Sequence, residues 1–194
     1  MMRIRAAVTE SQGASFAIEE LELGELRPDE ILVEVHAAGI CHTDLICRDQ
    51  WMPVPLPAVL GHEGAGVVRE VGAFVTKVRP GDRVAMSFAS CGACANCLKG
   101  RSTYCQDIFG RNFGASRPDG TSILSRDGEV VHGHFFGQSS FATHAVATAR
   151  NVVKLPDGVD LAIAAPFGCG IQTGAGGVLN VLQAEAGSSI AVFG

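Results

Sequence analysis

Three residues with the chemistry of zinc ligands lie far apart in the sequence. Cys41 begins the run Cys41-His42-Thr43-Asp44, His62 lies within Gly61-His62-Glu63-Gly64, and Cys169 lies between two glycines near the C-terminal end. Two thiolates and one imidazole are the ligand set of a catalytic zinc that keeps one coordination position open. A His-Glu pair alone carries little information, but together with the two cysteines it predicts an open metal site.

A second set of four cysteines is confined to one short run. Cys91, Cys94, Cys97 and Cys105 have the spacing C-x2-C-x2-C-x7-C, which can wrap one tetrahedral ion. Four thiolates leave no position for a substrate, so the run predicts a structural zinc. An iron–sulfur cluster is the main alternative, but ferredoxin runs close with a shorter gap and a proline, whereas Gln106 follows here. Two disulfides would require an oxidising compartment.

Composition limits the class of protein. Hydrophobic side chains make up 47% of the 194 residues, enough to bury a real core, and the net charge of −5 comes without a lysine or arginine cluster. This pattern argues against a nucleic-acid or anionic membrane surface. The sequence has neither the apolar core of a secretory signal nor a run of membrane-spanning length. We therefore expect a cytoplasmic protein without nucleic-acid or membrane partners, whose cysteines serve metal or thiol chemistry.

The residues before and after the first ligand are predicted to be mainly β-structure. Partly alternating β-branched and aliphatic runs predict strands at 4–9, 16–23, 31–36, 64–75 and 84–88. After Cys41 the spacing becomes helical, with Thr43 or Asp44 as the predicted N-cap. Four glycines are interpreted as bulge and corner positions that aim His62, namely Gly64, Gly66, Gly72 and Gly81.

The residues after the four-cysteine run show a weaker periodic pattern. Residues 107–129 are interpreted as a surface loop, and strands are predicted at 129–132, 141–146 and 151–155, before a short helix capped by Asp160. No ligand spacing ties the later histidines to either cysteine set, so we interpret them as surface or hydrogen-bonded structural residues. These are His132, His134 and His144. Cys47 is interpreted as a packed thiol.

The last stretch changes character. Apolar residues follow helical spacing from Ile171 and stop near Gly187, and a hydrophobic strand is predicted from Ser189 to Gly194. A strand that ends on glycine is how a dinucleotide-binding βαβ unit begins.

These motifs together resemble the zinc-containing medium-chain alcohol dehydrogenases. The resemblance rests on Cys41, Gly61-His62-Glu63, Cys169, the four-cysteine run and Pro80-Gly81-Asp82-Arg83-Val84. The runs 41–46 and 53–66 are similar to those of the aryl-alcohol (benzyl-alcohol) branch. The resemblance implies a GroES-like, partly open β-barrel catalytic domain over residues 1–155. Residues 156–194 would begin a Rossmann domain that binds NAD.

The resemblance also implies roles for individual residues. Thr43 would take the alcohol proton, Asp44 would orient His62, and Glu63 would lie behind the zinc. His42 and Thr173 would contact the nicotinamide dinucleotide, as would Gly194. The ordinary alternatives are a helix cap for Thr43 and Asp44 and an exposed surface position for His42. The implied partners are a small alcohol or aldehyde and further copies of the chain in a homo-oligomer.

One position departs from the pattern of many relatives. A histidine three residues after the hydroxyl residue ends their proton path, and here that position is Ile46. Proton exit would then run through water, the cofactor ribose or His42. An apolar replacement suits an aromatic substrate, and Trp51, Met52, Phe88 and Phe135 are candidate pocket residues.

Two functional hypotheses follow. In the first, these residues belong to an NAD(P)-dependent zinc dehydrogenase that interconverts a primary, aromatic alcohol and its aldehyde by hydride transfer. In the second, the 194-residue chain is a zinc-binding domain without dehydrogenase activity of its own, because the dinucleotide fingerprint is missing from it.

Overall fold

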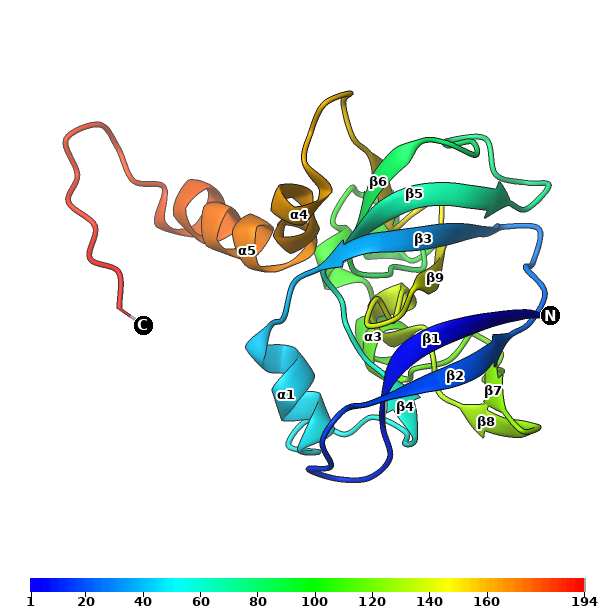
Figure 1. Ribbon diagram of the computed structural model, residues 1–194. Helices are drawn as coiled ribbons and strands as arrows, with labels where there is room; N and C mark the ends of the chain where they lie inside the picture. Colours follow the sequence, from blue (N-terminus) through cyan, green and yellow to red (C-terminus); the bar gives the residue numbers. More distant parts are fainter. Residues whose placement is uncertain (194) are drawn as a thin grey trace.

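Two curled five-stranded sheets form most of the molecule, which a computed structural model describes over residues 1–193 (Figure 1). The strands are β1 (Met2–Thr9), β2 (Ala17–Leu23), β3 (Glu30–Ala38), β4 (Ala58–Val59), β5 (Gly64–Val71), β6 (Arg83–Met86), β7 (Leu124–Arg126), β8 (Glu129–Val131), β9 (His144–Thr148) and β10 (Val152–Lys154). The sheet orders are β4-β1-β2-β7-β8 and β10-β6-β5-β3-β9, with antiparallel neighbours throughout. The mainly β, partly open barrel expected from the sequence is therefore confirmed.

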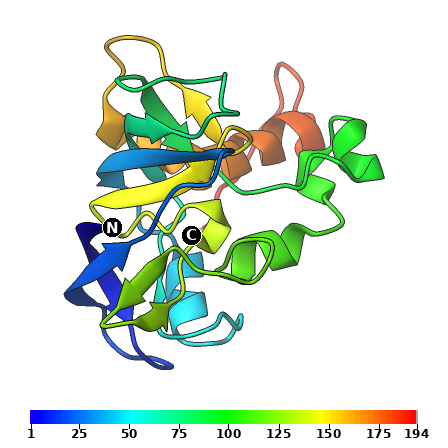
Figure 2. The same ribbon diagram turned by 90° about the vertical axis from the view of Figure 1, so that its right-hand side faces the viewer.

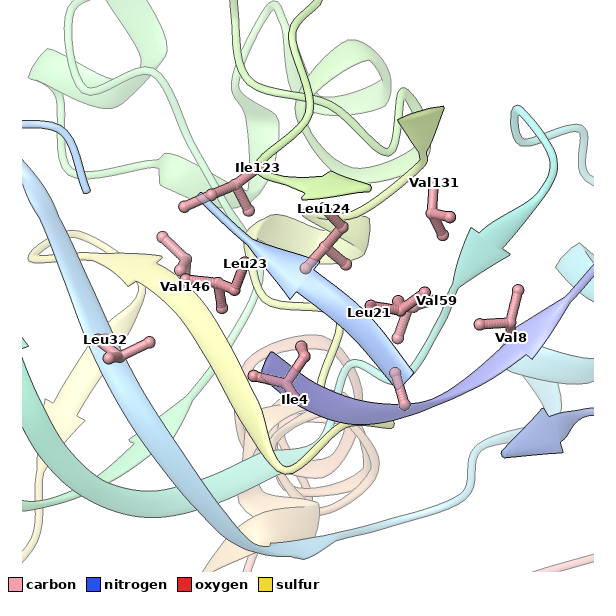
Figure 3. Close-up of a cluster of buried hydrophobic side chains, with 11 residues drawn as sticks. Ile4, Val8, Leu21, Leu23, Leu32, Val59, Ile123, Leu124, Val131 and Val146 are labelled. Carbon is pink, nitrogen blue, oxygen red and sulfur yellow. The ribbon is translucent and has the colours of Figure 1, made fainter. Parts of the chain in front are cut away.

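One apolar cluster joins the two sheets. The antiparallel register of β1 and β2 pairs Ile4 with Leu21, and both side chains are buried. Figure 3 shows them in one core with Leu124 from β7 and with Leu32 and Val146 from the other sheet. The alternation that predicted the first strands thus supplies the inward-facing side chains of the barrel.

The pairing of β3 with β5 sets where His62 lies. The register shifts between Val35 and Ala37, which marks a bulge beside the start of β5. A Cβ atom at Gly66 would collide with the Glu34 carbonyl group, and Gly61 has a φ of +90°. The observation at Gly66 is consistent with the prediction that it is a scaffold position that aims His62.

Helices are short and lie at the ends of strands. They are α1 (His42–Arg48), α2 (Ala95–Leu98), α3 (Ile108–Phe113), α4 (Leu161–Ala164) and α5 (Gly170–Gly176), with the 3-10 turns η1 (Ser102–Tyr104), η2 (Phe135–Gly137) and η3 (Ala165–Gly168) and the π-helical turn η4 (Gly177–Leu182). The predicted cap of α4 is confirmed, because Asp160 Oδ1 accepts the N–H of Ala162 at 2.8 Å. Figure 2 shows the four-cysteine segment near residue 100, in green, standing out from the barrel.

The interpretation of residues 107–129 as a loop was wrong. This segment holds α3 and β7, and both are fixed by contacts with distant residues. The buried side chain of Asn112 bonds to both backbone groups of Ala89, and Leu124 pairs with Leu23 on β2. Long-range partners of this kind leave no periodic signal in the segment itself.

The C-terminal stretch extends away from the barrel (Figure 1). The predicted helix is present as α5 and η4, although it ends at Leu182. The strand predicted from Ser189 was wrong for residues 189–193, because no neighbouring strand lies beside them in the part of the chain that the structure describes. Gly194 lies outside the described residues. Within residues 1–193 no single helix suffices to cross a membrane, and only the bent pair Leu161–Gly168 and Gly170–Leu182 meets the length and composition test.

Candidate metal centres

Asp44 connects the segments that carry Cys41 and His62. Its buried carboxylate accepts the N–H of Cys41 at 3.1 Å and that of Gly61 at 3.0 Å, and it lies 2.9 Å from Nδ1 of His62. Cys41 is the N-cap of α1, so the prediction of Thr43 or Asp44 as N-cap was wrong. The reason is that Asp44 is the third helical residue and reaches back to the Cys41 backbone, as in a capping box.

The two ring nitrogens of His62 have different surroundings. Nδ1 faces Asp44, whereas Nε2 is buried and has no hydrogen-bond partner within residues 1–193. Burial disfavours the charged ring, but Asp44 and the neighbouring Cys169 thiolate outweigh it and raise the pKa of His62 to about 10. The Phe136 ring stacks on the imidazole with 4.5 Å between centroids. An unpartnered buried nitrogen costs about 1–3 kcal/mol, which favours a ligand at Nε2.

Glu63 ties His62 to the segment that carries Cys169. Its Oε1 accepts the N–H of Gly170 at 2.7 Å, and its backbone carbonyl accepts the N–H of Gly39 at 2.9 Å. A Cβ at Gly39 would collide with the carboxylate of Glu63. The carboxylate therefore occupies space that only glycine leaves free.

The structure brings the residues of the predicted open site together. One ligand-type atom from each of Cys41, His62, Glu63 and Cys169 lies within 4.8 Å of the others. Thiolate sulfur, imidazole nitrogen and carboxylate oxygen are all zinc ligands, so this donor set fits zinc. Thr43 Oγ1 lies 3.6 Å from the Cys41 sulfur, at the edge of the cluster.

The four cysteines of the protruding run also converge. Their sulfurs lie within 4.8 Å of one another, and those of Cys91 and Cys97 are 3.9 Å apart. A tetrahedron with Zn–S bonds of about 2.3 Å has S···S edges of about 3.8 Å, so the spacing fits zinc. All seven cysteines are free thiols. Cys47 is fully buried, as predicted, and burial raises its pKa to about 12.

Backbone N–H groups favour thiolates in the four-cysteine run. Those of Gln106 and Cys97 lower the pKa of Cys94 to about 6, and those of Ala93 and Cys94 lower the pKa of Cys91. Burial, with added effects of the neighbouring sulfurs, raises the pKa of Cys97 to about 11. A metal ion that binds here would displace the proton that Cys97 retains.

The residues predicted to contact the cofactor lie on two different helices. His42 is the exposed first residue of α1. Thr173 is exposed on α5, where its N–H donates to the Cys169 carbonyl at 2.9 Å. Gly194, the third, lies outside the described residues, so the structure gives it no position.

A hollow of about 640 Å³ opens beside Cys169. Its lining includes Phe88, Ile108, Phe113, Phe136, Cys169 and Thr173. Sequence reasoning missed Phe113 and Phe136. Phe136 has a φ of 52°, and nothing in the sequence signals a bulky residue in the left-handed region.

Of the four residues predicted to form a substrate pocket, one lines this hollow. Phe88 lines the hollow, but Phe135 is fully buried and Met52 packs with the same apolar cluster. Trp51 is 84% exposed. The predicted pocket role was therefore wrong for Phe135, because the turn at η2 directs Phe136 toward the hollow in its place. Trp51 and Met52 do not line this hollow.

The three later histidines lie outside both clusters of metal-type ligands found in residues 1–193. Two of these partly exposed rings have one nitrogen that is buried and lacks a hydrogen-bond partner within residues 1–193, Nδ1 of His132 and Nε2 of His134, so neither ring is fully hydrogen-bonded. Burial lowers the pKa of all three rings, and that of His134 to about 4.

Comparison with known proteins agrees with the fold. Residues 27–157 match the family model of the alcohol dehydrogenase GroES-like domain. The chain is 49% identical to geraniol dehydrogenase from Castellaniella defragrans over 98% of its length and 51% of that protein. A crystal structure of an alcohol dehydrogenase zinc-binding domain protein from Burkholderia ambifaria superposes with a TM-score of 0.94 at 50% identity, covering 97% of this chain and 51% of the other. The crystal structure of benzyl alcohol dehydrogenase from Acinetobacter calcoaceticus superposes with a TM-score of 0.89 at 47% identity, covering 94% of this chain and 49% of the other.

The chain therefore belongs to the zinc-containing medium-chain alcohol dehydrogenase family, through its GroES-like domain. It spans about half the length of the relatives it matches.

Proposed function

We propose that this chain supplies the catalytic, zinc-binding part of an alcohol dehydrogenase that transfers a hydride between a primary alcohol and a nicotinamide cofactor, NAD or NADP. The observation that carries the proposal is the convergence of Cys41, His62 and Cys169 around an imidazole nitrogen that has no hydrogen-bond partner within residues 1–193. Because three protein ligands leave one position of a tetrahedral zinc for substrate, this cluster is assigned the catalytic role. The Cys91, Cys94, Cys97 and Cys105 cluster is assigned a structural zinc.

Cys41, His62 and Cys169 would hold the catalytic zinc, which supplies Lewis-acid chemistry that lowers the pKa of a hydroxyl group. Thr43 would accept the proton of the alcohol, since its hydroxyl group lies beside Cys41. Asp44 keeps Nδ1 of His62 as the donor, so that Nε2 remains available to the metal. With Ile46 at the next turn of α1, the proton would leave through water, the cofactor ribose or His42.

The substrate is proposed to be an aromatic or similarly flat, apolar primary alcohol. Three phenylalanine rings line the hollow beside Cys169, from Phe88, Phe113 and Phe136. Aromatic rings gain about 0.5–1.5 kcal/mol from stacked or edge contacts beyond the area they bury. The names of two relatives, geraniol dehydrogenase and benzyl alcohol dehydrogenase, point to unsaturated alcohols of this kind. By the same resemblance we assign the whole protein to the cytoplasm as a homo-oligomer.

Metal content per chain tests the metal assignment. Protein purified without added metal should contain two zinc ions, and Cys41→Ala and Cys94→Ala should each lose a different one. One zinc ion that is lost with Cys94→Ala and unaffected by Cys41→Ala would contradict the open site. That result would favour a zinc-binding domain without catalysis.

Activity can be tested in a chimera that joins residues 1–194 to the remaining half of the Burkholderia ambifaria relative. Reduction of NAD or NADP with benzyl alcohol would be followed by absorbance. We expect Thr43→Val to lower kcat by about 100-fold or more, the usual contribution of a positioned proton acceptor, while Thr43→Ser retains most of it. Equal activity in the two variants would remove Thr43 from the mechanism.

A further inference from the structure

Gln138 is a fully buried polar residue next to the candidate open site. Its Oε1 accepts the N–H of Gly64 at 3.0 Å, and its Nε2 donates to the carbonyl of His62 at 2.9 Å. The side-chain amide therefore binds the backbone on both sides of Glu63, at His62 and at Gly64. Neither Asp44 nor Glu63 makes these two contacts.

The same amide reaches the segment that leads to Cys169. Nε2 of Gln138 also donates to the carbonyl of Ser87 at 3.3 Å, directly after β6. The hydroxyl group of Ser87 donates to the carbonyl of Gly168 at 3.0 Å. Gly168 precedes Cys169, and a Cβ there would collide with the Met86 carbonyl group.

We infer that Gln138 is a positioning residue that, through Ser87, fixes the separation between His62 and Cys169. The inference rests on the proposed function, because it assigns a role toward the zinc of the open site. Asp44 connects Cys41 with His62, and Gln138 supplies a connection from His62 to Cys169 additional to that of Glu63.

The chemistry of the pocket explains why an amide fits this position. One neighbour is an N–H group and two are carbonyl groups, so the side chain must offer an acceptor at one end and a donor at the other. Methionine has a similar length but offers no donor. Glutamate keeps the acceptor for Gly64 and faces two carbonyl oxygens with its other oxygen.

The test is metal binding to the two clusters of the whole 194-residue chain, loaded with Co²⁺ as a spectroscopic probe. Cys41→Ala removes the open site, so its remaining absorption bands belong to the closed site. Cys94→Ala removes the closed site, so its remaining bands belong to the open site. Competition with a chelator then gives the affinity of each site for Zn²⁺. We expect Gln138→Met to weaken the open site by about 10- to 100-fold and to shift its Co²⁺ bands, the usual effect of losing a residue that orients metal ligands. Gln138→Glu should weaken the open site at least as much, because it buries a carboxylate oxygen against the carbonyl groups of His62 and Ser87.

Asn112 is the matched control. It is as deeply buried and also makes three side-chain hydrogen bonds, but they go to Ala89 and Ile108. Asn112→Leu should leave the Co²⁺ bands of the open site unshifted. Ser87→Ala removes the bond to the Gly168 carbonyl and the bond that Ser87 Oγ accepts from Gln172 Nε2, and it keeps Gln138 intact. It therefore tests the same connection if Gln138→Met does not fold, with an expected loss of open-site affinity of about 10-fold.

An unchanged open site in Gln138→Met, or equal weakening of both sites, would overturn the inference. If Gln138→Met does not fold, unchanged open-site affinity in Ser87→Ala would overturn the inference. Failure of the proposed function looks different, because the unsubstituted chain would then bind no metal that depends on Cys41.

Discussion

The two cysteine-containing clusters are assembled in opposite ways. The closed set comes from residues 91–105, where backbone N–H groups contact the sulfurs and three of the four cysteines are partly exposed. The open set comes from three distant segments and is held by buried side chains, Asp44, Glu63 and Gln138. A local loop can therefore form the first set, whereas the second exists only when the barrel has folded.

This difference predicts separate responses to substitution. Changes in the barrel interior should affect the open set and spare the closed one, because backbone N–H groups of the protruding run itself donate to the sulfurs of Cys91 and Cys105.

The largest effect is expected from Asp44→Ala. The substitution leaves His62 and the N–H groups of Cys41 and Gly61 without their buried carboxylate. Removing one partner of a buried charged pair costs about 3–5 kcal/mol, so the free energy of unfolding should fall by that amount. Denaturant titration of the metal-free protein measures it, and metal analysis should show loss of the open-site ion alone.

Asp160→Ala provides the control for Asp44→Ala. Asp160 also accepts a backbone N–H at a helix start, but it caps α4 and has no buried partner, so its loss should cost about 1 kcal/mol. Equal destabilisation by the two substitutions, or loss of both metal ions from Asp44→Ala, would contradict the separation of the two clusters.

His62 and His134 differ in the direction in which the fold shifts their pKa. Asp44 and Cys169 raise the pKa of His62, whereas burial lowers the pKa of His134 to about 4 and Arg117 reinforces this against the opposing charge of Glu30. The unfolded chain binds this proton near pH 6.5 and the folded chain only near pH 4. Between those values the unfolded state binds more protons, so stability falls as the pH falls.

His134→Asn should remove that dependence. Asparagine tolerates the φ of 63° at this position and does not titrate. From pH 7 to pH 5 the unsubstituted chain should lose about 2 kcal/mol more stability than the variant. Urea titrations at both pH values, with a chelator present to exclude metal loss, measure the difference. Parallel losses in the two proteins would show that His134 is not responsible.

The same distinction explains what could be predicted from the sequence. The closed set could be predicted because its four cysteines lie at zinc-ligand spacing within one loop. The open set could be predicted because the residue types of its ligands fit one metal. The contacts of Gln138 and the direction of Phe136 depend on the left-handed turn at η2, which no local pattern indicates. The strand predicted at Ser189 failed for a related reason, since apolar β-branched residues pair only where a neighbouring strand exists.

Phe136 provides the last and smallest test, on substrate choice. Its ring both stacks on His62 and lines the hollow, so it can contact a flat substrate beside the metal ligands. In the chimera described above, Phe136→Leu should raise KM for benzyl alcohol by about 10-fold, which corresponds to about 1.4 kcal/mol, and should leave KM for ethanol nearly unchanged. Trp51→Ala is the control, because that ring is exposed to solvent and should not affect either KM. If Trp51→Ala raised KM for benzyl alcohol and Phe136→Leu did not, the substrate would bind near the end of α1, and the aromatic hollow beside Cys169 would have another role.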